Sequence, residues 1–198
     1  MPLTNGYATL ATAKSYLAIT RDAYDARLES LITAVSRQID EHCGRRFYAA
    51  SDTRYYTATD PYCLDLADDL RTVTTLKTDE DGDRTYEITW DSSDDYYLTP
   101  YNAVTDGRPY TGIEVDRTNG DYTFPCRPRG VQIVGSFGYC ATGSQPAAVE
   151  EACLRLVKRL TDEVQTAGAE VIAPNLGRIV SRDVLDLLWP YVRRRGFA

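Results

Sequence analysis

The spacing of apolar residues changes twice along the chain, and these changes limit the folds open to it. The first third has the three-and-four spacing of helices, and a helical pattern returns after Pro146. Between them, from Phe47 to about Tyr139, the chain is rich in Tyr, Thr, Val and Asp, with turn residues at short intervals. That composition is typical of short antiparallel strands. We therefore predict an α+β fold, a helical bundle with an inserted antiparallel β-subdomain.

The same changes divide the 198 residues into four parts. We predict a helical N-terminal part of the bundle at residues 1–46, an inserted β-rich subdomain at 47–140, a helical C-terminal part of the bundle at 141–190, and a basic, aromatic tail at 191–198. A chain of this length fits one domain, or a compact body with one sizeable insertion.

The helix ends have recognisable local signals. A short helix is expected after Thr9 or Thr12, because either hydroxyl can accept a hydrogen bond from the first turn. A longer helix is expected to begin near Asp22 and to stop at Gly44, because glycine readily takes the left-handed conformation that ends helices. A last short helix is expected after Ser181.

The middle of the chain contains seven expected strands: Thr53–Ala58, Cys63–Leu66, Val73–Asp79, Thr85–Asp91, Tyr96–Thr99, Gly112–Val115 and Val131–Tyr139. The clearest hairpin joins the third and fourth of them. Asp81 and Gly82 are expected to form its tight turn, since an Asp-Gly pair supplies the positive φ angles of such turns.

Composition excludes several classes of protein. The net charge of −7 disfavours a protein that grips DNA phosphates over a broad face, although a passage through which DNA slides gains from acidic walls. No stretch approaches the roughly 20 apolar residues that span a bilayer. The first residues lack the basic start and apolar run of a signal peptide, so synthesis in the cytosol is expected.

The cysteines give no sign of a metal site or of disulfides. Five of them are widely spaced along the chain, without any CxxC pair. We expect buried small hydrophobic residues in a reducing compartment.

One acidic run resembles the start of a calcium-binding loop. Asp79, Asp81 and Asp83 have the right spacing, but the sixth position is Arg84 where glycine is needed, and the twelfth is Trp90 where glutamate is needed. The hairpin turn explains the same residues without a metal ion. We therefore expect no metal site here.

Catalytic residues are equally hard to find. His42 is the only histidine, and no oriented partner or nucleophile pattern accompanies it. The pairs Asp68-Asp69 and Asp94-Asp95 are reminiscent of two-metal nucleases, yet both lie in expected turns, where solvated acids are common. We predict a protein that is not an enzyme and has no cofactor.

The tail is the most distinctive polar feature. Together with Trp189 just before it, the tail has the residue types that dominate protein–protein hot spots: Trp189, Tyr191, Arg193, Arg194, Arg195 and Phe197. We predict that these residues bind a partner protein. Two alternatives stay open, in which Trp189 packs under the last helix beside solvated arginines, or the arginines contact phosphate.

Several segments, in their order and spacing, resemble the head–tail connector (adaptor) family of tailed phages, which includes prophage and gene-transfer-agent versions. They are YATLATAKSYLAI, SRQIDEHCGRRFY, TRYY, LRTVTTLKTDEDGDRTYEITW, DGRPYTGIEV, RPRGVQIVGSFGY and VEEACLRLVKRL. The resemblance runs from about Tyr7 to Tyr191.

This resemblance implies a structural role in the virion neck. Connectors of this kind form a ring, expected here to be a dodecamer, beneath the portal protein. They extend the channel through which DNA passes without specific binding, and they dock a downstream head-completion or tail-terminator protein. The family's C-terminal segment commonly contacts the portal, which implies that role for the tail residues above. No membrane partner is expected.

Two other functions stay open at this point. One is a different neck component, such as a tail terminator, which would also lack an active site. The other is a metal-dependent nuclease that uses the acidic pairs.

Overall fold

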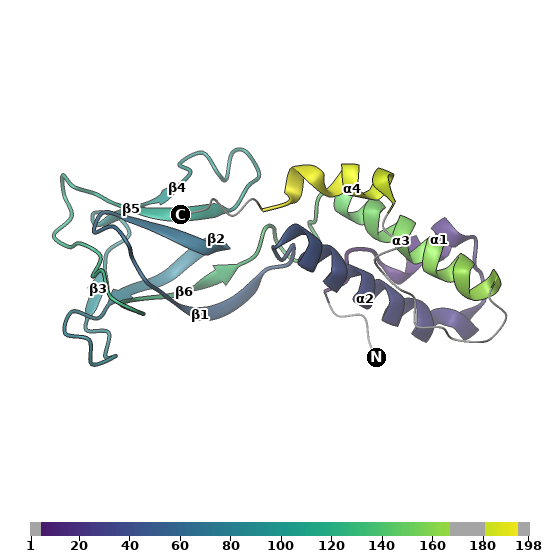
Figure 1. Ribbon diagram of the computed structural model, residues 1–198, viewed down its shortest axis with the longest axis horizontal. Helices are drawn as coiled ribbons and strands as arrows, with labels where there is room; N and C mark the ends of the chain where they lie inside the picture. Colours follow the sequence, from purple (N-terminus) through teal and green to yellow (C-terminus); the bar gives the residue numbers. More distant parts are fainter. Residues whose placement is uncertain (1–4, 167–180, 194–198) are drawn as a thin grey trace. The chain divides into compact units, whose positions relative to one another are not determined.

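The computed structural model describes residues 5–166 and 181–193, and the chain forms two compact units (Figure 1). The helical unit combines Met1–Phe47 with Thr142–Ala198, and the sheet unit is Tyr48–Ala141. The first contains helices and the second an antiparallel sheet. The predicted α+β class is confirmed.

The helical unit is built from these described elements: α1 (Leu10–Leu17), η1 (Asp22–Tyr24), α2 (Asp25–Cys43), α3 (Ala147–Thr166), α4 (Arg182–Leu188) and η3 (Trp189–Tyr191). The Thr9 side chain accepts the Thr12 amide at 3.0 Å, so Thr9 is the cap of α1. The helix expected near Asp22 begins as the 3-10 turn η1 and continues as α2. Gly44 ends α2 with a φ of 62°, as predicted.

Apolar faces of α2, α3 and α4 form the core of this unit (Figure 1). The buried apolar residues that these helices contribute are Leu28, Ile32, Val35, Ile39, Cys43, Val149, Ala152, Cys153, Leu154, Leu156, Val157, Leu160, Val184 and Leu188. One buried hydroxyl lies among them. Ser36 donates to the Ile32 carbonyl at 2.6 Å and accepts the Tyr7 amide at 3.0 Å, so the first described residues are tied to α2.

The sheet unit is an antiparallel sheet in the order β1-β6-β2-β5-β4, with β3 paired to β2. Its strands are β1 (Ala50–Tyr56), β2 (Cys63–Thr78), β3 (Ile88–Trp90), β4 (Tyr96–Thr99), β5 (Tyr110–Val115) and β6 (Val131–Phe137). The first half of β2 pairs with β5 and the second half with β6, with shifts of register between them. Such irregularities bend a strand, so β2 joins the two layers seen in Figure 1.

Aromatic side chains fill the core of the sheet unit. Trp90 stacks on Phe124 with ring centroids 4.7 Å apart, and its indole N–H donates to Thr78 at 3.0 Å. The Tyr96 and Tyr122 rings also lie beside Trp90. The surroundings of the Trp90 ring therefore depend on the packing of this unit.

Two expectations for the strands are wrong. β2 is continuous where two strands and a turn at Asp68-Asp69 were expected, because Asp68 accepts Arg54 at 2.7 Å and the Tyr56 hydroxyl at 3.1 Å within the sheet. The β2–β3 pairing exists, but Thr78 faces Ile88. The turn is therefore the long loop 79–87 and not a tight turn at Asp81-Gly82.

The cysteines are only partly as expected. Cys43, Cys140 and Cys153 are buried, whereas Cys63 and Cys126 are exposed. Burial raises the pKa of the Cys153 thiol to about 12, so this thiol stays protonated near neutral pH.

Within the described ranges, none of the helices combines the length and the apolar character that crossing a bilayer requires.

Candidate functional site

The C-terminal segment Trp189–Arg193, here called the docking segment, follows directly after α4. Val184 and Leu188 anchor α4 in the core. The next residue, Trp189, turns outward and is 64% exposed. The alternative in which Trp189 packs under the last helix is therefore wrong, and a large apolar side chain is offered to solvent.

Tyr191 packs inward instead. Its ring meets the ring of Phe47 edge-on, with centroids 5.9 Å apart, and Phe47 meets Tyr7 in the same way at 5.6 Å. Phe47 is fully buried. Three segments far apart in the sequence thus share one aromatic stack within the helical unit.

A main-chain hydrogen bond holds the end of the docking segment. The Arg193 amide donates to the carbonyl of Cys43 at 2.8 Å, and this carbonyl belongs to the last turn of α2, where carbonyl groups lack partners within the helix. This bond ties the docking segment to the end of α2. Arg194, Arg195 and Phe197 lie outside the described residues.

A polar network supports the aromatic stack. The Tyr7 hydroxyl donates to Asp40 in α2 and accepts the Phe47 amide at 3.0 Å. Arg37 pairs with Asp40 at 3.3 Å and lies over the Tyr7 ring. Burial, reinforced by the Asp40 carboxylate, raises the pKa of Tyr7, and burial also raises the pKa of Asp40 against the opposing effects of Tyr7 and Arg37.

Sequence reasoning missed this network. Tyr7 and Asp40 are 33 positions apart, and no local pattern links them. The only available signal was that a tyrosine and a phenylalanine flank the first two helices.

Charged pairs join α3 to α4, where the docking segment begins. Arg155 and Arg159 bind Asp183 at 3.1 and 3.0 Å. Arg159 and then Arg155 lower the pKa of Asp183. Ser181 occupies the capping position of α4, but its hydroxyl bonds the Asp183 side chain and not a backbone amide. These exposed pairs contribute to the placement of α4.

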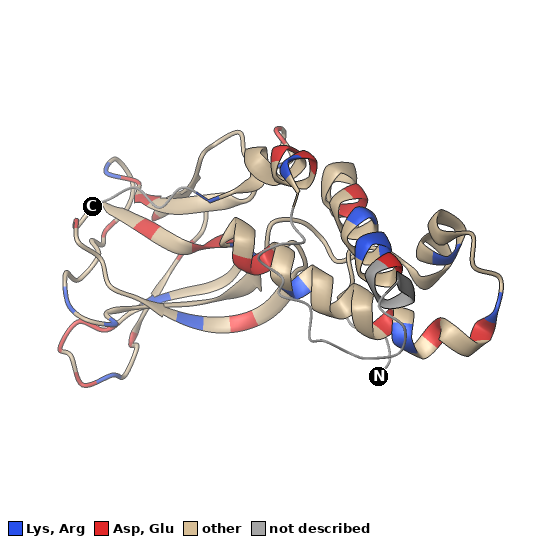
Figure 2. Ribbon diagram, turned by 45° about the vertical axis from the view of Figure 1, so that its right-hand side comes forward, with Lys and Arg blue, Asp and Glu red and all other residues tan. Residues whose placement is uncertain are grey.

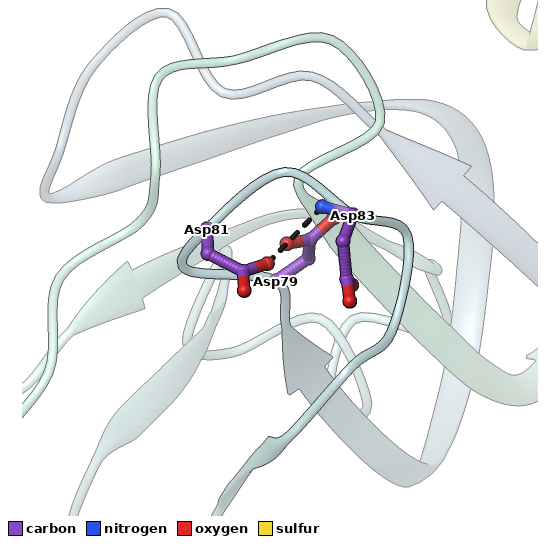
Figure 3. A group of neighbouring side chains, drawn as sticks. All are labelled: Asp79, Asp81 and Asp83. Carbon is purple, nitrogen blue, oxygen red and sulfur yellow. Dashed lines mark hydrogen bonds between the residues drawn. The ribbon is translucent and has the colours of Figure 1, made fainter.

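The acidic loop 79–87 brings Asp79, Asp81 and Asp83 together, with possible ligand oxygens within 4.8 Å of one another (Figure 3). Their carboxylates are engaged by the loop itself. Asp79, only 3% exposed, accepts the amides of Gly82 at 2.6 Å and Arg84 at 2.9 Å. Asp81 accepts the Asp83 amide at 3.1 Å. The geometry explains these acids as loop-shaping residues.

The acidic pairs considered for a nuclease are also engaged. Asp68 binds Arg54, and Asp95 accepts the Asp91 amide at 2.6 Å. Asp69 and Asp95 are buried, which contradicts the expectation of solvated turn acids. Among the residues that the structure describes, neither pair belongs to a group of three close metal-ligating side chains. His42 is exposed at the end of α2.

Charges of both signs are interspersed over each unit (Figure 2). This distribution fits the net charge of −7 and disfavours a broad surface for DNA phosphates. The feature that stands out is local, namely the exposed side chain of Trp189.

Residues 7–74 match the family described as Phage gp6-like head-tail connector protein. This match confirms, for that part of the chain, the family resemblance seen in the sequence. The comparison with curated proteins gives no match.

The fold is similar to that of chains in gene transfer agent (GTA) particles. A chain in the neck of an empty GTA particle computed with C6 symmetry is 18% identical, with a TM-score of 0.59, over 99% of this chain and 95% of that one. A chain in the neck of a native GTA particle computed with C12 symmetry is 19% identical, with a TM-score of 0.57 and the same coverage. A chain in the virion of the native particle is 18% identical, with a TM-score of 0.60 and again the same coverage.

Proposed function

We propose that this chain is a structural head–tail connector (adaptor) subunit in the neck of a tailed-phage-type particle, either a virus or a gene transfer agent. Two observations together support the proposal. Residues 7–74 match the connector family, and 99% of the chain shares its fold with a neck chain of a GTA particle. It would be made in the cytoplasm of the bacterial host and act after incorporation into the particle.

In the proposed assembly, identical copies close into a ring of twelve beneath the portal. The C12 symmetry used for the native GTA neck supports this number. Such a ring needs two different lateral faces that mate head-to-tail. Exposed tyrosines of the sheet unit are suited to these contacts, because they supply contact area at low entropic cost: Tyr55, Tyr62, Tyr97 and Tyr101.

The portal would bind the C-terminal residues Trp189, Tyr191, Arg193, Arg194, Arg195 and Phe197. The exposure of Trp189 supports this role, since tryptophan and arginine are the residue types that dominate interface energetics. Tyr191 would act by holding the segment against Phe47. A downstream head-completion or tail-terminator protein would bind elsewhere on the ring.

The connector would act through its surfaces and would not be an enzyme. Its net charge of −7 is compatible with a channel wall along which DNA slides without being held. The carboxylates considered for metal chemistry shape loops and strands instead, as Asp79 and Asp68 do.

Binding to the isolated portal ring of the same particle tests the proposal. We expect the free chain to be a monomer by size-exclusion chromatography with light scattering, and to bind the portal through the docking segment. Trp189→Ala should weaken that binding about 30-fold or more, as for a hot-spot residue. Unchanged portal binding by this variant would contradict the docking role. Binding to the tail tube, without binding to the portal, would favour a tail terminator, and magnesium-dependent cleavage of DNA would favour a nuclease.

A further inference from the structure

We propose that neighbouring copies of this chain bind head-to-tail through the two outer faces of the sheet unit. One face, here called the carboxylate face, consists of Tyr62, Cys63, Asp65, Tyr97, Tyr101 and Glu114. The other, here called the arginine face, consists of Tyr55, Lys77, Tyr86, Arg129 and Gln132. This inference rests on the proposed function, and it assigns the exposed tyrosines to two different faces that fit each other.

The strand register places the carboxylate face on one side of the sheet. Cys63 of β2 faces Glu114 of β5, and Glu114 faces Tyr97 of β4, so these three side chains project to the same side. Their strand neighbours Leu64 and Ile113 also face each other and are buried in the core. Because side chains alternate along a strand, the row with Glu114 lies on the outer side.

Exposed rings surround a carboxylate on this face. The Tyr101 ring meets the Tyr97 ring edge-on, with centroids 6.1 Å apart, and the Tyr101 hydroxyl donates to Glu114 at 2.6 Å. Tyr97 is 46% exposed and Tyr101 is 63% exposed. Asp65, in the next outward position of β2, is exposed as well. The face therefore combines apolar contact area with negative charge.

The margin of the carboxylate face contains a further exposed tyrosine. The guanidinium of Arg117 lies over the Tyr62 ring, 4.1 Å from its centroid. Carboxylates nevertheless surround the neighbouring Cys63. Partial desolvation, followed by Asp60 and Glu114, raises the pKa of the Cys63 thiol, and Arg117 opposes them. A partner that matches this face must offer a cation.

The arginine face lies on the outer side of the other layer. Tyr55 of β1 faces Gln132 of β6, Gln132 faces Lys77 of β2, and Lys77 faces Thr89 of β3. Ile133, next to Gln132, is buried. The buried residues of both layers belong to one core cluster, so the two outer faces lie on opposite sides of that core (Figure 1).

Arg129 is the cation that the arginine face presents. Its guanidinium lies over the Tyr55 ring, 4.3 Å from the centroid, and the Tyr86 ring lies beside Tyr55. The Arg129 amide donates to the Thr57 hydroxyl at 3.1 Å, and its carbonyl accepts the Tyr86 hydroxyl at 2.9 Å. Arg129 also keeps a side chain at a φ of 57°, where glycine would be less strained. A cation held in this way loses little conformational entropy on binding.

The loop 79–87 beside the arginine face contains acids of its own. Asp79 accepts the amides of Gly82 and Arg84, and Asp83 accepts the Thr85 amide at 2.6 Å. These carboxylates are therefore engaged by the main chain of their loop. The contacts that the structure describes for Arg129 are with neutral groups, so its charge suits a carboxylate from another molecule.

A second copy of this chain fits both faces at once. A closed ring of identical copies needs two different faces on each copy that mate with each other. Here the guanidinium of one face matches the carboxylates of the other, and tyrosines on both supply contact area. Because the faces lie on opposite sides of one core, each copy can bind a neighbour with each face. DNA would be repelled by the carboxylate face.

Cross-linking through the natural Cys63 thiol tests the contact. Cys63 is exposed on the carboxylate face, Thr89→Cys adds a thiol to the arginine face, and Cys126→Ser removes the other exposed thiol. A short bismaleimide should link this variant, in a concentrated solution of the free chain, into a ladder of trimers and longer chains. Its yield should exceed that of an Arg27→Cys control, exposed in α2, about tenfold or more, because neighbouring thiols react as one molecule.

The outcomes of this experiment are distinct. The chain that keeps Cys63 as its exposed thiol, without Thr89→Cys, should stay uncross-linked. A dimer joined through two Cys63 thiols would show a face that binds itself and would overturn the head-to-tail contact. An equal ladder from the Arg27→Cys control, or no ladder from the Thr89→Cys variant, would overturn it as well.

Copies with one blocked face test the direction of the contact. Asp65→Arg/Tyr101→Ala blocks the carboxylate face, and Tyr55→Ala/Arg129→Gln blocks the arginine face. In sedimentation velocity at high concentration, each variant alone should associate about tenfold or more weakly than the wild type. An equal mixture should form dimers that grow no further, because only one pair of intact faces is left. Unchanged Trp90 fluorescence checks that both variants are folded.

Two results of the mixing experiment would overturn the proposal. One is the absence of dimers, and the other is growth of the mixture to trimers and longer chains. Wild-type association by the carboxylate-face variant, with loss of the downstream protein from assembled particles, would assign that face to the downstream protein instead.

The failures of the two proposals are distinguishable. Failure of the wild type to bind the portal would sink the proposed function. The cross-linked ladder is measured on the free chain and needs no portal, so it decides separately whether the two faces mate.

Discussion

The polar network around Tyr7 in the helical unit and the acidic loops of the sheet unit use their polar groups in different ways. In the helical unit, the Tyr7 hydroxyl joins Asp40 in α2 to the Phe47 amide, so one side chain ties together segments far apart in the sequence. In the sheet unit, Asp79 and Asp95 accept amides from their own loops. The long-range bonds hold distant segments of the chain together, whereas the local bonds fix the shape of a loop. A group of carboxylates is therefore not in itself a site.

The largest effect expected from this comparison follows removal of a buried ring. Phe47→Ala removes the ring between Tyr7 and Tyr191 and should destabilise the helical unit by about 3–5 kcal/mol. Each unit contains one of the two tryptophans, Trp189 and Trp90, so chemical denaturation followed by fluorescence can monitor both.

The matched control is Phe124→Ala, an equally buried ring that stacks on Trp90 in the sheet unit. It should change the Trp90 transition more than the Trp189 transition, and Phe47→Ala should do the opposite. Equal shifts of both transitions in both variants would remove the distinction between the units.

The next effect concerns the long-range hydrogen bonds. Tyr7→Phe removes the hydroxyl that accepts the Phe47 amide and donates to Asp40, which should cost about 1–3 kcal/mol. The loss should appear in the Trp189 transition in urea. A variant as stable as the wild type would show that the network adds nothing to the packing of the rings.

A smaller effect is expected from the local bonds of the acidic loop. Asp79→Ala removes the acceptor of the Gly82 and Arg84 amides and should cost about 1 kcal/mol, because water can reach part of the loop. Asp81→Ala, which removes only one such bond, is the control and should cost less. Millimolar calcium should leave the melting temperature unchanged, and a clear rise that depends on Asp79 would revive the metal hypothesis.

The smallest effect should appear only in acid. Hydrogen bonds from the Thr118 amide, the Tyr97 hydroxyl and Asn119 lower the pKa of Asp116 from 3.8 to about 2. Because the folded state has the lower pKa, these bonds contribute stability above about pH 4 that is lost as the pH falls through about 2. Asp116→Asn should therefore be less stable than wild type at neutral pH, and the difference should shrink towards pH 2. A difference that is constant with pH would contradict this assignment.

The sequence predicts the features that depend on neighbouring residues. The cap at Thr9 and the stop at Gly44 follow from local hydrogen bonding and from the conformational freedom of glycine, and the structure confirms both. The alternation of strand and helix patterns likewise suffices for the α+β class. These signals act over a few residues, so they survive in any tertiary context.

Features that depend on distant partners could not be predicted in this way. In the sequence, Asp68 has the character of a turn residue, and only the fold brings Arg54 of β1 beside it in β2. Asp81 and Gly82 predict a tight turn from the sequence alone. In the structure, the Asp79 carboxylate accepts the amides of Gly82 and Arg84, and the turn is a longer loop. The tail composition pointed to a docking segment, but the opposite orientations of Trp189 and Tyr191 depend on Phe47.

The most direct test of the account is a cryo-electron microscopy map of the neck of purified particles. We expect this chain to form a closed ring against the portal, with the docking segment Trp189–Arg193 at the contact. A map in which the chain is absent from the head–tail junction, or lies there without touching the portal, would contradict the central claim.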